Sequence, residues 1–113
     1  MEYWHNPRCS KSREALALLE QHGYRPTIRD YLKDAPSADE IRSVVSKLRL
    51  SSARDLMRTK EAIYKELGLK DVSDEDQLIK AMADNPKLIE RPVLIHDARA
   101  ALGRPVERIL DAV

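Results

Sequence analysis

The chain has 113 residues, of which 42% are hydrophobic, and its 20 basic and 19 acidic residues leave a formal net charge of +1. This length suits one domain with a single core, and we expect residues 1–113 to form it. A near-neutral charge, with four tyrosines, one tryptophan and no phenylalanine, argues against a nucleic-acid partner. No apolar run is long enough for a membrane span or resembles a signal peptide, so we expect a cytoplasmic protein with no membrane partner.

The only cysteine, Cys9, lies in the segment His5-Asn6-Pro7-Arg8-Cys9-Ser10-Lys11-Ser12-Arg13. Residues 1–4, before this segment, predict a short edge strand. After it, apolar residues recur with the spacing of an amphipathic helix, at Ala15, Leu16, Leu18 and Leu19. We therefore expect Cys9 in a turn from strand to helix, at the start of the helix.

A helix start favours a negative sulfur, because its first backbone N–H groups have no internal partner and its dipole is positive there. Four basic or titratable side chains lie within four residues of Cys9, namely His5, Arg8, Lys11 and Arg13. Such surroundings lower a thiol pKa from about 8.5 towards about 3.5 to 7.5. A lone cysteine is more often a small buried hydrophobe, but a thiol among these charges makes no sense as core packing.

Two further features of the sequence bear on Cys9 as a candidate nucleophile. Ser10 or Ser12 can cap the helix, and either hydroxyl could donate a hydrogen bond to the sulfur. The chain has no second cysteine, so it forms no internal disulfide, and any redox cycle must take its other thiol from another molecule.

Further along the chain, His22-Gly23 predicts the end of the first helix, and residues 27–32 alternate polar and apolar as a strand. A second helix begins at a Ser37 to Glu40 capping box and should bury Ile41, Val44, Val45 and Leu48. Helical segments follow at 51–57, at 61–67 and after a Ser73 cap up to Asn85-Pro86. Residues 37–85 therefore predict a helical insertion without a strand.

The last part of the chain returns to β structure. The apolar run Val93-Leu94-Ile95 is typical of a central strand, and a turn at 96–98 can lead into a second strand at 99–102. Gly103-Arg104-Pro105 should end that strand and begin a final helix, whose apolar face contains Val106, Ile109, Leu110 and Val113. The order β-α-β, helices, β-β-α predicts an α/β protein with a mixed sheet.

These residues together resemble the ArsC family of arsenate reductases, which use glutathione and glutaredoxin on a thioredoxin-like fold. The family motif His-Asn-Pro-x-Cys-x-x-Ser-Arg is met by residues 5–13, and Leu56-Met57-Arg58 matches the context of the family's central arginine. Arg91-Pro92 and Gly103-Arg104-Pro105 match two later Arg-Pro pairs. The resemblance covers nearly the whole chain and is closest to the short, single-cysteine members.

The resemblance implies a site and a reaction. The catalytic residues are Cys9, Arg58, Arg91 and Arg104, and Pro92 matches the cis-proline that faces the active cysteine. Arginine offers a planar fork of donors that suits a tetrahedral oxyanion such as arsenate. The Cys9 thiolate attacks arsenic, glutathione attacks the adduct as co-substrate, and glutaredoxin completes the reduction to arsenite, with no bound cofactor and no metal.

Two residues of the loop each have two possible roles. His5 helps to keep Cys9 ionised or fixes the loop by hydrogen bonds, and Ser12 donates to the thiolate or caps the helix. The remaining histidines, His22 and His96, have no partner at metal-ligand spacing.

Three other functions are alternatives to this one. A phosphatase-like loop, Cys-x5-Arg, is absent because position 15 is Ala. A Spx-like regulator that binds RNA polymerase usually carries a Cys-x-x-Cys pair, where this chain has Cys9 and Ser12. A glutathione-dependent thiol oxidoreductase with another substrate stays open, because Lys11 stands where plasmid-type members have a small residue.

Overall fold

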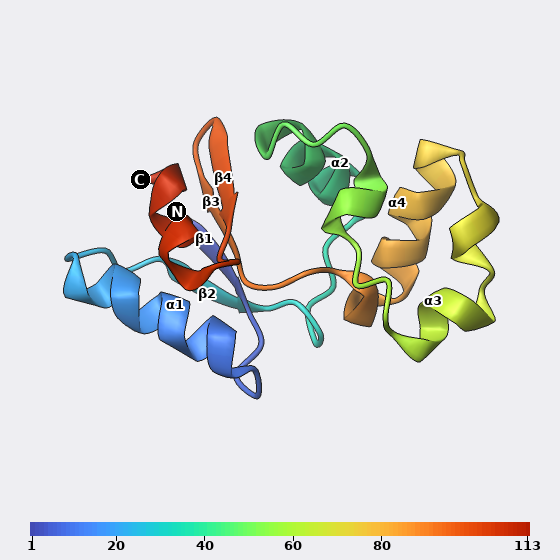
Figure 1. Cartoon of the computed structure of the whole chain (residues 1–113). Helices are drawn as coiled ribbons and strands as arrows, with labels where there is room; N and C mark the ends of the chain where they lie inside the picture. The colour runs from blue at the N-terminus through green and yellow to red at the C-terminus, as the bar shows by residue number, and fades with distance from the viewer. The chain divides into compact units, whose positions relative to one another are not determined.

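The computed structural model describes all residues, 1–113, and the chain divides into two compact units. One unit contains residues 1–34 and 91–113, and the other contains residues 35–90. The first unit holds all four strands, and the second is built from helices (Figure 1). No helix is long and apolar enough to cross a bilayer.

The first unit is organised on a mixed sheet with strand order β2-β1-β3-β4. Its strands are β1 (Glu2–His5), β2 (Thr27–Asp30), β3 (Val93–His96) and β4 (Arg99–Leu102). β1 runs parallel to β2 and antiparallel to β3, which forms a hairpin with β4. The β-α-β unit and the hairpin expected from the sequence are therefore present, although β2 ends two residues earlier than predicted.

The prediction that the first strand lies at an edge is wrong. β1 is paired on both sides, because β3 adds to it from the C-terminal part of the chain. Its two middle residues, Tyr3 and Trp4, are 0% and 1% exposed. Such burial of two consecutive residues means that both faces of the strand are covered, as an interior strand requires.

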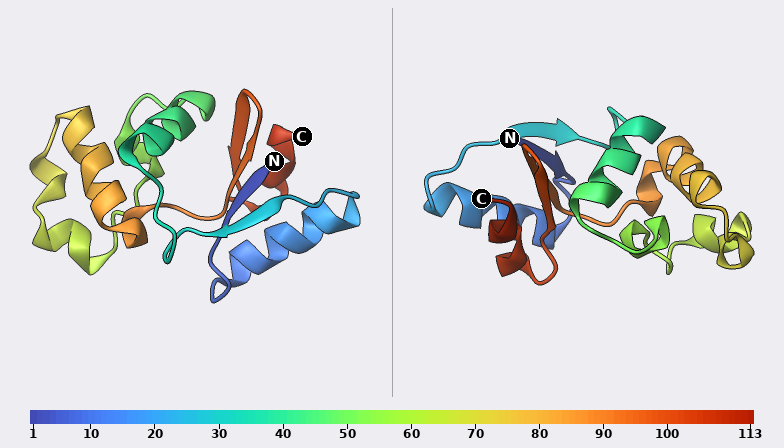
Figure 2. Two further views of the ribbon diagram at one scale, coloured as in Figure 1. Left: turned by 180° about the vertical axis from the view of Figure 1, so that it is seen from behind. Right: turned by 90° about the horizontal axis from the view of Figure 1, so that it is seen from above.

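One face of this sheet carries the core of the unit. Tyr3 pairs in register with Leu94, and Leu94 with Ala101, so the three side chains form a row across the sheet. Helix α1 (Ser10–Gln21) and the 3₁₀ helix η4 (Val106–Ala112) cover this row on the same side of the sheet (Figure 1, Figure 2). They contribute the buried side chains Ala15, Leu19, Ile109 and Ala112.

The final helix differs in type from the prediction, because η4 is a 3₁₀ helix. A period of three residues places Val106, Ile109 and Ala112 on one face, and the last two are fully buried. Val113, which the α-helical prediction placed inward, lies beyond the last turn and is only partly buried. The tighter helix therefore matches the burial that the structure shows.

The regular elements of the second unit are all helices, and residues 37–85 contain no strand, as the sequence predicted. Its elements are α2 (Ala38–Lys47), η1 (Ala53–Leu56), α3 (Ala62–Glu66), η2 (Leu69–Asp71), α4 (Glu75–Asp84) and η3 (Pro86–Leu88). The capping box of Ser37 and Glu40 begins α2, with bonds of 3.1 and 3.0 Å. α4 is capped by Asp74 instead of the predicted Ser73.

Candidate active site

Cys9 is the N-cap residue of α1, in the turn between β1 and the helix, where the sequence placed it. Its backbone N–H donates to the carbonyl of Asn6 at 3.0 Å, and its carbonyl accepts the N–H of Arg13 at 3.1 Å. No side chain caps this helix, so neither Ser10 nor Ser12 has the capping role that was offered for it. The first amide groups of the helix are thereby left for the sulfur.

Asn6 shapes this turn, and sequence reasoning missed it. The residue is 9% exposed, and its Oδ1 accepts the backbone N–H of Arg8 at 3.0 Å. Its backbone N–H donates to Ser12 Oγ at 3.0 Å. An asparagine that bonds the backbone two residues ahead is a known turn-former, and that local signal could have identified it.

Ser12 is the centre of a buried hydrogen-bond group beneath the turn. Its hydroxyl lies 2.7 Å from His5 Nδ1 and also accepts from Asn6, and the residue is 0% exposed. Tyr3 Oη donates to the Ser12 carbonyl at 2.6 Å. Burial is the main reason that the pKa of Tyr3 is raised, so it stays a neutral donor. Sequence reasoning missed Tyr3, which reads there only as a strand residue.

His5 takes part in this group through its ring Nδ1, and its surroundings favour the uncharged form. Burial lowers the pKa of its imidazole, Arg13 lowers it further, and Asp30 only partly opposes them. The uncharged form favoured by this lower pKa gives the Cys9 thiolate no charge stabilisation. Of the two roles offered for His5, the observed bond to Ser12 corresponds to fixing the loop.

The Cys9 thiol has a lowered pKa, in the expected direction. Burial alone would raise the pKa, but the backbone N–H of Ser12, the guanidinium of Arg91 and the N–H of Lys11 outweigh it. The neighbouring basic side chains contribute less than the sequence suggested, since Arg13 donates to the Pro7 carbonyl at 2.8 Å and Lys11 pairs with Glu14 at 3.7 Å. The thiolate is therefore stabilised mainly by the helix start and by an arginine from elsewhere in the chain.

Arg91 and Arg104 meet Cys9, as the resemblance implied. Arg104 Nη2 lies 3.9 Å from Cys9 Sγ, and its Nε donates to the carbonyl of Arg91 at 2.9 Å. Arg91 bonds the sulfur through its side chain. The Arg91–Pro92 peptide bond is cis, which agrees with the family pattern, and Arg104–Pro105 is cis as well, which was not anticipated.

The two Arg-Pro pairs approach each other because residue 103 has no side chain. The N–H of Gly103 donates to the carbonyl of Pro92 at 3.0 Å. A Cβ at this position would lie 2.6 Å from Pro92 Cγ and 3.3 Å from Ala15 Cβ. Only glycine lets the end of β4 pass so close to Pro92, which brings Arg104 to the thiol.

Arg58 lies in the helical unit, where two carboxylates contact its side chain. Its Nε is 3.0 Å from Glu61 Oε1 and its Nη1 is 3.2 Å from Glu90 Oε1. The backbone N–H of Arg58 donates to the carbonyl of Leu88 at 2.7 Å, beside the β-bridge that joins Met57 to Ile89. Arg58 is thus held by two carboxylates inside its own unit.

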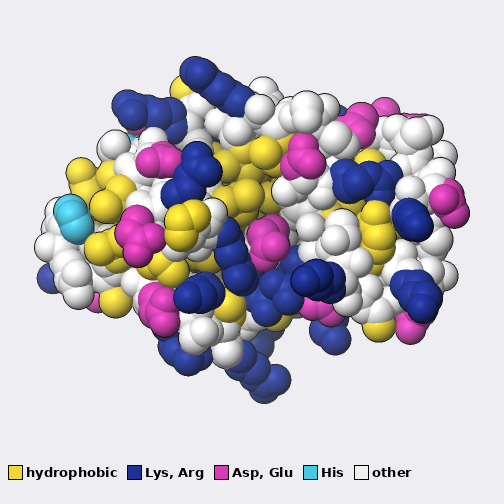
Figure 3. Space-filling view, viewed as in Figure 1, with side chains coloured by type: hydrophobic (Ala, Val, Ile, Leu, Met, Phe, Trp, Pro, Cys, Tyr) yellow, Lys and Arg dark blue, Asp and Glu magenta, His cyan; other side chains and the backbone are white.

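Basic side chains gather at the turn before α1. Figure 3 shows them at the lower edge of the view, over the start of the helix, while acidic and basic groups alternate over much of the remaining visible face. Arg8 in this turn and Lys11 and Arg13 in the first turn of α1 are exposed. This local excess of positive charge suits an anionic substrate at Cys9.

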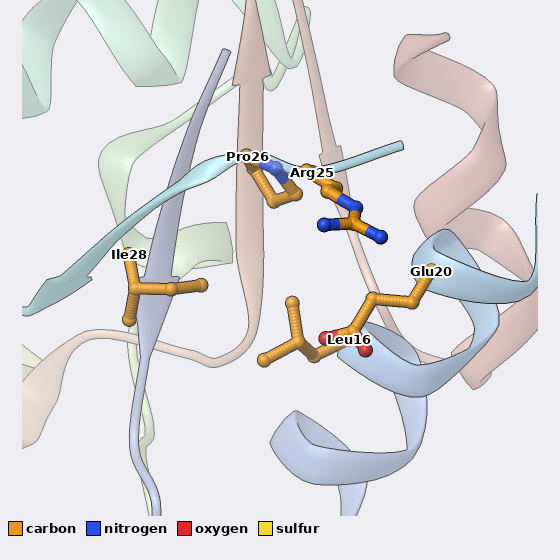
Figure 4. A pocket seen from close by; sticks show the side chains of 5 residues that line it. All are labelled: Leu16, Glu20, Arg25, Pro26 and Ile28. Carbon is orange, nitrogen blue, oxygen red and sulfur yellow. The ribbon is translucent and has the colours of Figure 1, made fainter. Parts of the chain in front are cut away.

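Two pockets open in the first unit. One, of about 440 Å³, is lined by α1 and the segment after β4, through Lys11, Glu14, Gly103, Arg104, Pro105, Val106 and Glu107. The other, of about 510 Å³, is lined by Leu16, Glu20, Arg25, Pro26 and Ile28 (Figure 4). The second contains no nucleophile, and the first includes an arginine that contacts Cys9.

This chain is similar to known proteins along nearly its whole length. The ArsC family model matches residues 4–112. An arsenate reductase of Neisseria meningitidis is 47% identical over 96% of this chain and 94% of that protein, and the uncharacterized Escherichia coli protein YfgD is 48% identical over 100% and 96%. The solved structure of an arsenate reductase from Vibrio cholerae, 46% identical, matches with a TM-score of 0.95 over 100% and 98% of the two chains. The thioredoxin-like fold is thereby confirmed, and the chain belongs to the ArsC family.

Proposed function

We propose that this protein reduces arsenate to arsenite, with glutathione as co-substrate and glutaredoxin as the partner that completes the reduction. The observation that carries the proposal is the meeting of the Cys9 sulfur with Arg91 and Arg104 at the start of α1. A thiolate beside two guanidinium groups can both attract a tetrahedral oxyanion and attack its central atom. Relatives named arsenate reductase, in Neisseria meningitidis and Vibrio cholerae, support this choice of oxyanion.

The first step joins sulfur to arsenic. The Cys9 thiolate attacks arsenate, an As–O bond breaks, and the oxygen leaves as water after it takes up protons. Arsenic keeps the oxidation state +5 in the resulting Cys9–S–As adduct. Arg91 and Arg104 neutralise charge on the remaining oxygens, and the N–H groups of Lys11 and Ser12 stabilise the thiolate before attack.

The reduction itself needs two external thiols, because the chain contains one cysteine. Glutathione thiolate attacks the arsenic of the adduct and displaces a second oxygen as water. A glutaredoxin thiolate then attacks the glutathione sulfur, so that a glutathione–glutaredoxin disulfide forms and the electron pair of the As–S bond stays on arsenic, which becomes +3. Water cleaves the Cys9–As bond, which releases arsenite and restores the Cys9 thiol.

The other residues of the proposed site have distinct parts. Arg58 is the third oxyanion donor, and this assignment rests on the resemblance alone. His5 and Ser12 position the turn, because their hydrogen bond links the strand end to the first turn of α1. No bound cofactor or metal is part of this proposal, and the reaction would take place in the cytoplasm, where glutathione keeps thiols reduced.

The test is oxidation of NADPH by the purified protein with glutathione, glutaredoxin and glutathione reductase, measured with and without arsenate. Arsenate-dependent oxidation that disappears in Cys9→Ser supports the proposal. If NADPH is not oxidised although Cys9 still alkylates rapidly at neutral pH, arsenate is not the substrate. Activity of the wild type on a low-molecular-weight disulfide in the same assay would then favour a glutathione-dependent thiol oxidoreductase.

A further inference from the structure

The pocket beside Cys9 has a charge pattern that the attack on arsenate does not use. It has a volume of about 440 Å³ and lies between the first turn of α1 and the segment from Gly103 to Glu107. Two of its lining side chains are cationic, Lys11 and Arg104, and two are anionic, Glu14 and Glu107. An inorganic oxyanion needs cations only, so the carboxylates indicate a ligand that also carries positive charge.

Cys9 itself does not line the pocket, but two of the lining residues contact its sulfur. Arg104 lines it and places Nη2 3.9 Å from Cys9 Sγ. Lys11 lines it with its side chain while its backbone N–H bonds the same sulfur. The pocket therefore adjoins Cys9 through these two residues, and its volume is within the range of small-molecule sites, about 300 to 1,000 Å³.

Three charged side chains of the pocket, Lys11, Glu14 and Glu107, are exposed to solvent. Lys11 Nζ is 3.7 Å from Glu14 Oε2, and the two side chains are 51% and 56% exposed. An exposed pair of this kind contributes at most about 1 kcal/mol, so its partners exchange easily.

We propose that this pocket is the subsite for the thiol co-substrate, and that it selects a thiol with both carboxylate and ammonium groups, the chemistry of glutathione. Lys11 binds a carboxylate, and Glu107, with Glu14 released from Lys11, binds the ammonium group. This proposal rests on the proposed function for the identity of the reaction. It is also consistent with the single cysteine of the chain, because the second thiol must come to Cys9 from another molecule.

The subsite explains how the external thiol reaches the adduct. The bound thiolate lies next to Arg104 and attacks the atom attached to Cys9 Sγ, and holding it there replaces a collision from solution. Lys11 then has a specific role. A small residue at position 11 would remove the cation that binds the carboxylate of the incoming thiol, while the helix amides at the sulfur would stay unchanged.

The experiment needs no arsenate, so its outcome is independent of whether arsenate is the substrate. Cys9 is converted with 5,5′-dithiobis(2-nitrobenzoate) to its mixed disulfide with thionitrobenzoate. An added thiolate attacks Cys9 Sγ, the S–S bond breaks, and thionitrobenzoate, the thiolate of lower pKa, leaves as a coloured anion. The rate is measured with three thiols: glutathione, 3-mercaptopropionate, which has a carboxylate and no ammonium group, and uncharged 2-mercaptoethanol.

The proposal predicts saturation with glutathione and none with 2-mercaptoethanol. Lys11→Gln should lower the second-order rate for glutathione by about threefold to fivefold, in line with one exposed charged contact, and leave the rate for 2-mercaptoethanol unchanged. Glu107→Gln should slow glutathione by a similar factor and leave 3-mercaptopropionate unchanged or faster. Arg25→Gln, at the other pocket of the same unit, is the matched control and should change none of the rates.

Two results would overturn the proposal. If Glu107→Gln accelerates glutathione as much as 3-mercaptopropionate, the carboxylate acts only through net charge and binds no ammonium group. If Lys11→Gln slows all three thiols equally, Lys11 affects the reactivity of the disulfide and not the binding of the incoming thiol. Far-ultraviolet circular dichroism of each variant verifies that these exposed substitutions leave the fold unchanged.

Discussion

Arg104 Nη2 lies 3.9 Å from Cys9 Sγ, although the two residues are 95 positions apart in the sequence. The approach depends on the register of the sheet, in which β3 pairs with β1 and β4 follows β3, so that the end of β4 returns to the start of α1. The same guanidinium donates to the carbonyl of Arg91 at 2.9 Å. A thiolate at the N-terminus of a helix is thus joined to two cations that local sequence does not bring to it.

Removal of the sulfur should separate chemistry from folding. We expect Cys9→Ser to abolish arsenate-dependent NADPH oxidation, because a hydroxyl at this position stays protonated at neutral pH and does not attack arsenic. The free energy of unfolding, measured in urea, should change little, because Cys9 is only partly buried. Residual reductase activity in this variant would disprove the thiolate mechanism.

The two arginines should matter to oxyanion use. Arg91→Ala or Arg104→Ala removes a charge-assisted partner of the oxyanion, which costs on the order of 2 to 3 kcal/mol, or about 30-fold to 150-fold in kcat/KM for arsenate. Arg108→Ala is the matched control, because Arg108 is exposed and its Nε pairs with Asp111 at 3.4 Å. Unchanged kcat/KM in both site variants would mean that neither arginine binds the substrate.

The hydroxyl of Ser12 should stabilise the fold of the turn. In Ser12→Ala the buried N–H of Asn6 and the ring of His5 lose their shared partner, at a cost of about 1 to 3 kcal/mol in the free energy of unfolding. Ser10→Ala, at an exposed position of the same helical turn, should change it by about 0.5 kcal/mol or less. Equal effects in urea unfolding of both variants would contradict this role.

The pH dependence of Cys9 alkylation should show its lowered pKa. The rate with iodoacetamide should reach half its maximum below the ordinary thiol value of about 8.5, and Arg91→Met should move that midpoint upward. Because the folded state favours the thiolate, Cys9 stabilises the fold fully above its unfolded pKa, and that contribution is lost as pH falls through the folded pKa. The stability of the wild type relative to Cys9→Ser should therefore increase with pH across this window.

Gly103→Ala should test the close approach of the two Arg-Pro pairs. The new methyl group would lie 2.6 Å from Pro92 Cγ, and overpacking of this kind costs about 1 to 3 kcal/mol in the free energy of unfolding. Gly23→Asn is the control, because nothing lies within 4 Å of a Cβ there and asparagine tolerates its φ of +84° better than most residues. An unaltered urea midpoint in Gly103→Ala would show that β4 can shift away from Pro92 at no cost.

Local sequence determined the elements and the candidate nucleophile. The capping box at Ser37, the stop at Gly23 and the start of α1 at Cys9 depend on residues within a few positions of each other. Hydrogen bonds and capping of this range act in the chain before it folds, and sequence patterns record them directly. The order of the strands and helices followed from the same signals.

Only the tertiary structure decided what surrounds the thiol. Tyr3 reads in the sequence as a strand residue, yet its hydroxyl bonds the Ser12 carbonyl. The sequence left His5 either to help keep Cys9 ionised or to fix the loop, and in the structure its ring bonds Ser12 Oγ. β1 is interior because β3, some ninety residues later, pairs with it. Burial and long-range pairing depend on the whole packed unit, and no short sequence window contains them.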